Sequence, residues 1–71
     1  MEWTEVDVRV GRRWEREDGY AVVSVRETAS GEWAVTYDRL TQAPEGEAYD
    51  RATEPDEEAA LDRAKEYRNR A

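Results

Sequence analysis

The 71-residue sequence contains neither cysteine nor histidine. Without cysteine there can be no disulfide framework, zinc–thiolate site or thiol nucleophile. Without histidine, the side chain that most often serves as general base and as transition-metal ligand is missing too. Serine and threonine are present, but no histidine can activate them and no G-x-S-x-G nucleophile elbow surrounds them. We therefore expect no enzymatic activity, no cofactor and no metal.

Long apolar segments are also absent. No stretch has the roughly 20 consecutive apolar residues that a membrane-spanning helix needs. The N-terminal segment MEWTEVDV is acidic and alternating, unlike a secretory signal or a transit peptide. A chain of 71 residues has room for one small core. We therefore expect a single cytoplasmic domain over residues 1–71, with no membrane partner.

Lysine and large aliphatic residues are scarce, whereas acidic residues are abundant. The 18 acidic residues outnumber the 11 basic ones and give a net charge of -7, and Lys65 is the only lysine. Molar salt shortens the Debye length to roughly 3 Å, which largely removes the mutual repulsion of an acidic surface. The composition therefore indicates a halophilic protein in a high-salt cytoplasm, as in salt-loving archaea.

The dipeptide Asp18-Gly19 predicts a first hairpin. It suits a two-residue type I′ turn, which needs positive φ at both central residues. A turn at this point places Trp14 opposite Val23 in an antiparallel pair, so the two side chains share one face of the sheet.

A three-residue loop, Ala29 to Gly31, predicts a second hairpin. It places Val25 opposite Val35 and puts Gly31 where a left-handed bulge residue is needed. A two-residue Ser30-Gly31 loop would shift the register by one residue and turn the apolar side chains that follow to the other face. The apolar pattern therefore favours the three-residue loop.

These turns predict strands at about residues 5–16, 20–28 and 32–39, and a short strand at 47–52 with Tyr49 turned inward. Val6, Val8 and Val10 continue the apolar face in parity, unless Gly11 forms a bulge. The other side chains expected on that face are Trp14, Val23, Val25, Trp33, Val35 and Tyr37.

Residues at about 54–69 have the pattern of an amphipathic helix. Thr53 is expected at the N-cap, Pro55 in the first turn and Asp56 at the capping-box position. The predicted fold is therefore α+β, an antiparallel meander of three to four strands with one C-terminal helix packed on one face. The apolar stripe of the helix consists of Ala60, Leu61, Ala64 and Tyr67.

Two segments, Gly31-Glu-Trp-Ala-Val35 and Thr53-Glu-Pro-Asp-Glu-Glu-Ala-Ala-Leu-Asp-Arg-Ala64, resemble the G-x-W-x-V strand and T-x-x-x-E-A-A-x-x-x-A helix of the YegP-like small-domain family. The resemblance covers roughly residues 20–70 and implies the same meander and helix, without a settled activity. The whole acidic chain also looks like a short, uncharacterised haloarchaeal protein family. Its outline is similar to the arm-binding domain of tyrosine integrases, whose sheet reads DNA, but here the sheet and loops carry many carboxylates.

Protein–protein interaction, including homodimer formation, is the function that the sequence favours. One helix with a single leucine is a thin cover for the sheet, so a second copy could bury aromatic side chains that do not fit the inward parity. The loop after the third strand could also contact a partner, because a loop on a rigid scaffold is free to recognise other molecules. The candidate interaction residues are Trp3, Tyr20, Leu40 and Pro44.

The arginines predict the alternative function, a nucleic-acid-binding accessory protein. Arginine contacts phosphate bidentately, and the candidate contacts on the face away from the core are Arg9, Arg13 and Arg26. Acidic neighbours on that face and the loss of phosphate affinity in salt make this function the less favoured one. Arg16 is not a candidate, because it shares the parity of Trp14 and is expected to hold its charged head in water at the edge of the core.

Overall fold

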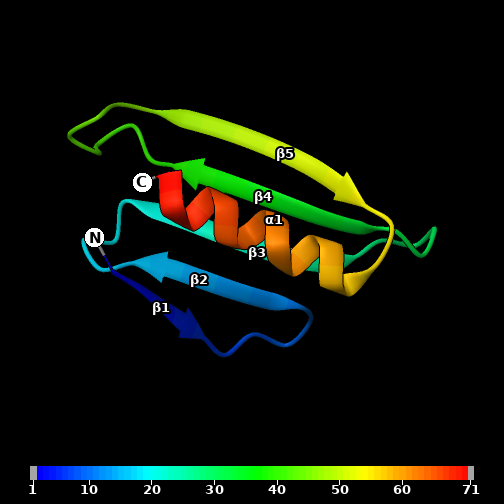
Figure 1. The fold of residues 1–71 in the computed structure, drawn as a ribbon. Coiled ribbons are helices and arrows are strands. Elements are labelled where there is room, and N and C mark those ends of the chain that lie inside the picture. Colours follow the sequence, from blue (N-terminus) through cyan, green and yellow to red (C-terminus); the bar gives the residue numbers. More distant parts are fainter. Residues whose placement is uncertain (1, 71) are drawn as a thin grey trace.

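The chain forms an open antiparallel sheet with one helix lying across one of its faces (Figure 1). A computed structural model describes residues 2–70, so the two ends of the predicted domain, Met1 and Ala71, lie outside the described residues. The strands lie side by side in sequence order, which confirms the predicted α+β meander but gives it five strands in place of three to four. In chain order the elements are β1 (Trp3–Val6), β2 (Arg12–Arg16), β3 (Ala21–Glu27), β4 (Trp33–Arg39), β5 (Ala48–Glu54) and α1 (Glu57–Arg70).

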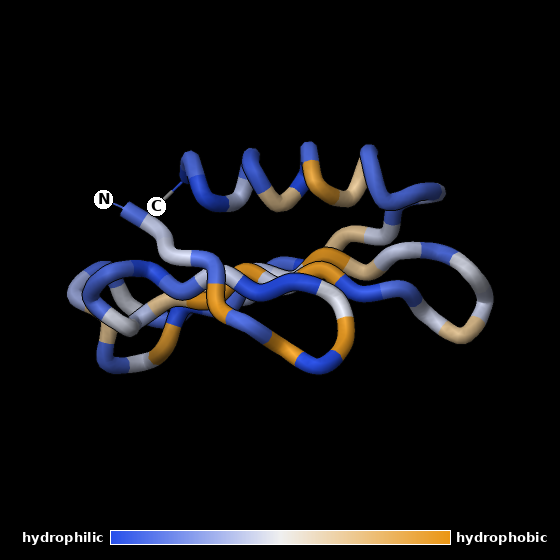
Figure 2. The backbone as a smooth tube through the Cα atoms, turned by 90° about the horizontal axis from the view of Figure 1, so that it is seen from below, coloured by the Kyte–Doolittle hydropathy of each residue, from blue (hydrophilic) through white to orange (hydrophobic). Residues whose placement is uncertain are grey.

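The molecule has two layers, which the edge-on view of Figure 2 separates. The helix packs on β3, β4 and β5. Among residues 2–70, no element covers the opposite face of the sheet. Each large side chain buried between the layers stabilises the fold by about 1.5–3 kcal/mol. The buried core consists of Trp14, Val23, Val25, Val35, Tyr37, Ala60, Ala64 and Tyr67.

Both predicted hairpin registers are confirmed. Trp14 pairs with Val23 across β2 and β3, and Val25 pairs with Val35 across β3 and β4. Gly31 has a φ angle of 86°, the left-handed conformation that the second loop requires. The predicted type I′ turn at Asp18-Gly19 is wrong, because Gly19 has φ 78° but no described residue other than glycine has positive φ. The Gly19 N–H donates to the Arg16 carbonyl at 2.8 Å instead, so Glu17 and Asp18 are the central residues of the turn. The turn chemistry and the apolar pattern together therefore determine the register of the three central strands.

The predicted first strand, residues 5–16, is wrong, because it is two strands joined by a turn. Gly11, with φ 75°, lies at the end of this turn and directly precedes β2. The folded-back β1 places Val6 opposite Arg13, on the face away from the helix. Val8 and Val10 lie in the connection and are 40% and 69% exposed, so none of the three valines continues the core face. An alternating sequence does not reveal such a reversal, because both short strands keep the period of two.

The predicted fourth strand forms as β5, but the inward orientation of Tyr49 is wrong. Tyr49 pairs with Asp38 on the open side of the sheet and is 66% exposed. The inward positions of β5 include two small residues, Ala48 and Ala52, which pack against the core. The register with β4 therefore places small residues, rather than an aromatic ring, on the helix side of β5.

Two acidic side chains on the inward side of β5 form ion pairs with the helix. Asp50 accepts a hydrogen bond from Arg70 Nη1 at 2.8 Å, and Glu54 accepts one from Arg63 Nε at 3.0 Å. These pairs connect the outer strand of the sheet to both halves of α1.

The helix begins later than predicted, and Asp56 takes the N-cap position in place of Thr53. The backbone N–H of Ala59 donates to Asp56 Oδ1 at 2.8 Å, which satisfies one of the free donors of the first turn. Thr53 belongs to β5, which continues to Glu54, because Pro55 disfavours helical geometry in Glu54 directly before it. The apolar stripe is confirmed, since Ala60, Ala64 and Tyr67 are buried and Leu61 packs against the core.

Trp3 packs against the core, contrary to its predicted position outside it. Its indole Nε1–H donates to the backbone oxygen of Arg68 at 3.0 Å, and its ring lies 6.5 Å from that of Tyr37. The bond satisfies a carbonyl in the last turn of α1 and connects the first strand to the end of the helix. Period-two parity could not predict this contact, because its two partners are 65 residues apart.

Arg16 is buried, with a fully inaccessible side chain, contrary to the expectation that its charged head lies in water. Its Nε donates to Asp18 Oδ1 at 2.9 Å, and its Nη1 and Nη2 donate to the two oxygens of Glu45 at 2.8 and 3.1 Å. The guanidinium thus connects the β2–β3 turn to the β4–β5 loop.

Candidate interaction surface

The side of the sheet that faces away from α1 is the candidate functional surface, and we call it the open face. In an antiparallel pair, residues directly opposite each other point to the same side. The observed registers therefore assign the open face to the strand residues that alternate with the core. These residues are Thr4, Val6, Arg13, Glu15, Val22, Ser24, Arg26, Ala34, Thr36, Asp38, Tyr49, Arg51 and Thr53.

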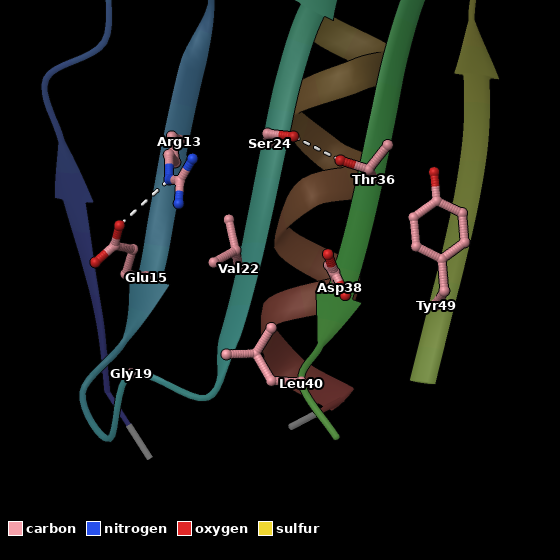
Figure 3. A pocket seen from close by; sticks show the side chains of 9 residues that line it. All are labelled: Arg13, Glu15, Gly19, Val22, Ser24, Thr36, Asp38, Leu40 and Tyr49. Carbon is pink, nitrogen blue, oxygen red and sulfur yellow. Dashed lines mark hydrogen bonds and ion pairs between the residues drawn. The ribbon is translucent and has the colours of Figure 1, made fainter. Parts of the chain in front are cut away.

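A shallow hollow of about 370 Å³ lies on the open face, over β2 to β5 and toward the end of the sheet where Gly19 and Leu40 lie (Figure 3). Val22, Leu40 and Tyr49 supply apolar surface to it, and Leu40 and Tyr49 are 40% and 66% exposed. Its floor includes Ser24 and Thr36, whose hydroxyl groups lie 2.5 Å apart and hydrogen-bond to each other. The remaining lining residues are Arg13, Glu15, Gly19 and Asp38.

Eight side chains of the open face form two parallel rows across β2 to β5. The registers place Arg13, Ser24, Thr36 and Arg51 side by side across β2 to β5, and we call these residues the basic row. One step along the strands, the acidic row consists of Glu15, Val22, Asp38 and Tyr49.

The charge of the open face differs from that of the whole chain. The basic row and Arg26 contribute three arginines, whereas the acidic row contributes two carboxylates, although the chain has a net charge of -7. Arg13 Nε donates to Glu15 Oε2 at 3.3 Å, so one of the three arginines is already paired within the chain. The open face is therefore close to neutral, with positive and negative charge separated along the strands.

The structure brings together only some of the residues predicted to form a site. Of the candidate interaction residues, Leu40 lines the hollow and half-buried Tyr20 is next to it, with the Leu40 N–H donating to the Tyr20 carbonyl at 2.8 Å. Pro44 is exposed in the β4–β5 loop but does not line the hollow, and Trp3 lies on the helix side.

The candidate nucleic-acid contacts divide in a similar way. Arg13 and Arg26 are exposed on the open face, as their parity predicted. Arg9 lies in the exposed β1–β2 connection and belongs to neither row. Sequence reasoning missed Tyr49 as a surface residue. It placed Val22 outside the core, because Val22 alternates with its inward-facing neighbour Val23, and the structure confirms this position on the open face.

Four of the polar side chains that line the hollow are paired with one another, Arg13 with Glu15 and Ser24 with Thr36. Histidine is absent from the sequence, and the hydroxyls of Ser24 and Thr36 bond to each other rather than to a base. Among residues 2–70, no group of three or more Asp and Glu side chains is arranged to hold a metal ion. The α1 helix is neither long enough nor apolar enough to cross a membrane.

A five-stranded meander with one covered and one open face defines this chain as a small α+β domain. The chain belongs to a family of unknown function, DUF7543, whose model matches residues 1–70. No curated protein and no solved structure matches it. The haloarchaeal origin and the resemblance to the YegP-like family stay predictions.

Proposed function

We propose that this domain is a non-catalytic protein-interaction module that binds its partner through the open face. The observation that carries the proposal is the exposure of Leu40 and Tyr49 around one hollow on the uncovered side of the sheet, which half-buried Val22 also lines. A solvated sheet face normally carries polar side chains, so exposed apolar side chains on it are unusual. Tyrosine is also one of the residue types that are enriched at interfaces.

Site-specific photo-crosslinking tests this function. A photoreactive phenylalanine analogue in place of Tyr49 is expected to give protein adducts of discrete mass in the native cell. The same analogue in place of Asp62, on the exposed side of the helix, is the matched control and is expected to give none. The additional change Val22→Glu should abolish the adducts, because it places an unpaired charge in the hollow.

Equal adducts from positions 49 and 62, or none from either, would contradict the proposal. The nucleic-acid alternative has some support, because Arg13, Arg26 and Arg51 share the open face. Fluorescence anisotropy with labelled DNA and RNA in molar KCl separates the two functions. Binding that is lost in Arg26→Glu, without protein adducts at position 49, would favour the alternative.

We also propose that the domain is halophilic and works in a high-salt cytoplasm, which the net charge of -7 supports. Dilution from molar KCl to 0.1 M lengthens the Debye length from roughly 3 to 10 Å and restores repulsion among the acidic side chains. We expect the far-UV circular dichroism to weaken on dilution and to recover when KCl is restored. Sucrose at equal osmolality is the control, because it stabilises folded proteins without screening charge. A far-UV signal that does not change with salt would contradict this proposal.

A further inference from the structure

The arrangement of charge on the open face indicates what binds there. We infer that the partner is a second copy of the chain, packed face to face about a two-fold axis that crosses the strands between the basic and acidic rows. This inference rests on the proposed function, because it requires the open face to be the docking surface. Beyond the proposed function, the inference names the partner and the residues of the two copies that contact each other.

The two rows are complementary when one copy is turned over onto another. A half-turn about the proposed axis keeps each strand over the same strand of the second copy and reverses its direction. Each residue of the basic row then lies over the acidic-row residue of its own strand. On β2, Arg13 therefore meets Glu15 of the second copy, and the symmetry of a two-fold interface produces this ion pair twice.

The other three strands give compatible contacts under the same rotation. On β4, the Thr36 hydroxyl meets the carboxylate of Asp38, which accepts hydrogen bonds. On β5, the guanidinium of Arg51 meets the ring of Tyr49, a favourable cation–π combination. On β3, the small side chain of Ser24 meets Val22 at the centre of the hollow, where large side chains would prevent close approach.

A two-fold axis parallel to the strands is the other way to stack two copies face to face. That axis exchanges β2 with β5 and β3 with β4. It places Arg13 over Arg51 of the second copy, a repulsion between like charges, and Val22 over the carboxylate of Asp38. The arrangement of charge therefore selects the axis that crosses the strands.

The size of the open face predicts the strength of this dimer. The five strands are spaced by about 4.8 Å, and the three longest have seven residues that rise about 3.3 Å each, so the face measures roughly 20 by 23 Å at its widest. Such an area lies at the low end of specific interfaces, so we expect a reversible dimer with a Kd on the order of micromolar. Stacked sheets lie about 10 Å apart, a distance that arginine and glutamate side chains can bridge.

Charge exchange between two variants tests the pairing. Arg13→Glu and Glu15→Arg each place like charges opposite one another, and each is expected to weaken self-association by about tenfold or more in sedimentation velocity. An equimolar mixture of the two variants should form a heterodimer, because each chain then supplies the charge that the other lacks. Both variants lose the 3.3 Å pair within the chain, and mixing cannot restore it, so recovery reports contacts between chains.

Two features of the charge-exchange experiment distinguish a specific Arg13–Glu15 pair between chains from an effect of net charge alone. Lys65→Glu, on the exposed side of the helix, changes the net charge as much as Arg13→Glu and should leave the dimer intact. Glu15→Arg makes the acidic chain less negative, so a non-specific effect would strengthen association rather than weaken it. The measurements use the lowest KCl concentration that retains the folded far-UV signal, because salt screens ion pairs.

The outcomes distinguish failure of this inference from failure of the proposed function. A wild-type chain that stays monomeric at millimolar concentration, with discrete adducts to another protein at position 49, overturns self-pairing and leaves the docking function intact. A dimer that neither Arg13→Glu nor Glu15→Arg weakens also overturns the inference. A monomer without any adduct at position 49 overturns both.

Discussion

Replacing Gly11 with alanine is expected to lower the free energy of unfolding by about 3 kcal/mol or more. An alanine Cβ at this position would lie 2.1 Å from the carbonyl oxygen of Val25 and 3.1 Å from the Cα atom of Arg26. Both atoms belong to the backbone of β3, so no side-chain rotation can relieve the overlap. A domain of this length has a total stability of roughly 4–10 kcal/mol, so the variant retains little of it.

Gly19→Ala is the matched control for this prediction. Gly19 has φ 78°, nearly the same as the 75° of Gly11, but no atom lies within 4 Å of its ideal Cβ position. The left-handed conformation alone costs a residue with a Cβ about 1–2 kcal/mol. Urea unfolding followed by tryptophan fluorescence measures both variants, and the excess loss in Gly11→Ala reports the contact with β3. Equal losses of stability in the two variants would show that the positive φ angle alone accounts for the need for glycine at position 11.

Replacing Arg16 with methionine is expected to destabilise the fold by about 2–3 kcal/mol, because a buried cation is lost and its partners stay behind. The loss is smaller than for a fully buried pair, since the side chains of Asp18 and Glu45 are 24% and 41% exposed and can regain water. Arg70→Met is the control. Arg70 makes an ion pair of the same 2.8 Å length with Asp50, but both side chains are about half exposed, so little or no loss is expected.

The Arg16→Met variant is also expected to change how the stability of the fold depends on pH. Hydrogen bonds from Arg16 hold the pKa of Asp18 and of Glu45 below their ordinary values. A carboxylate with a lowered pKa stabilises the fold above its unfolded-state pKa, and this contribution is lost as the pH falls through the folded-state pKa. Urea midpoints between pH 7 and 3 should therefore fall with acid in the wild type and less steeply in Arg16→Met. Parallel profiles would contradict the role of the guanidinium.

Local signals predicted the centre of the fold, because turn chemistry acts over a few residues. The glycines at positions 19 and 31 and the alternation of valine and tryptophan were sufficient for the register of β2, β3 and β4. The parity of Arg13 and Arg26, and hence their position on the open face, followed from the same turns. This part of the candidate site was available before any tertiary contact was known.

The sequence predictions that are wrong concern contacts between residues that are distant in the sequence. Arg16 is buried because Glu45, 29 residues later, reaches both of its terminal nitrogens. Tyr49 is exposed because β5 pairs with β4 in the register that places Tyr49 opposite Asp38 on the open face. Apolar parity predicted an inward tyrosine, but the loop of residues 40–47 is too long for a tight turn to set the register of β5. The place of Tyr49 on the candidate surface was missed for the same reason.

The ion pairs between β5 and the helix have a consequence for aggregation. A long outer strand offers its backbone to the edges of other sheets, which is the first step of fibril growth, and charged residues on its inner side oppose such addition. Asp50 and Glu54 occupy this position on β5 and are held there by Arg70 and Arg63. An added strand would extend the sheet past the helix beside these carboxylates. The ion pairs therefore oppose the addition of another strand at the β5 edge, and none of their residues lies on the open face.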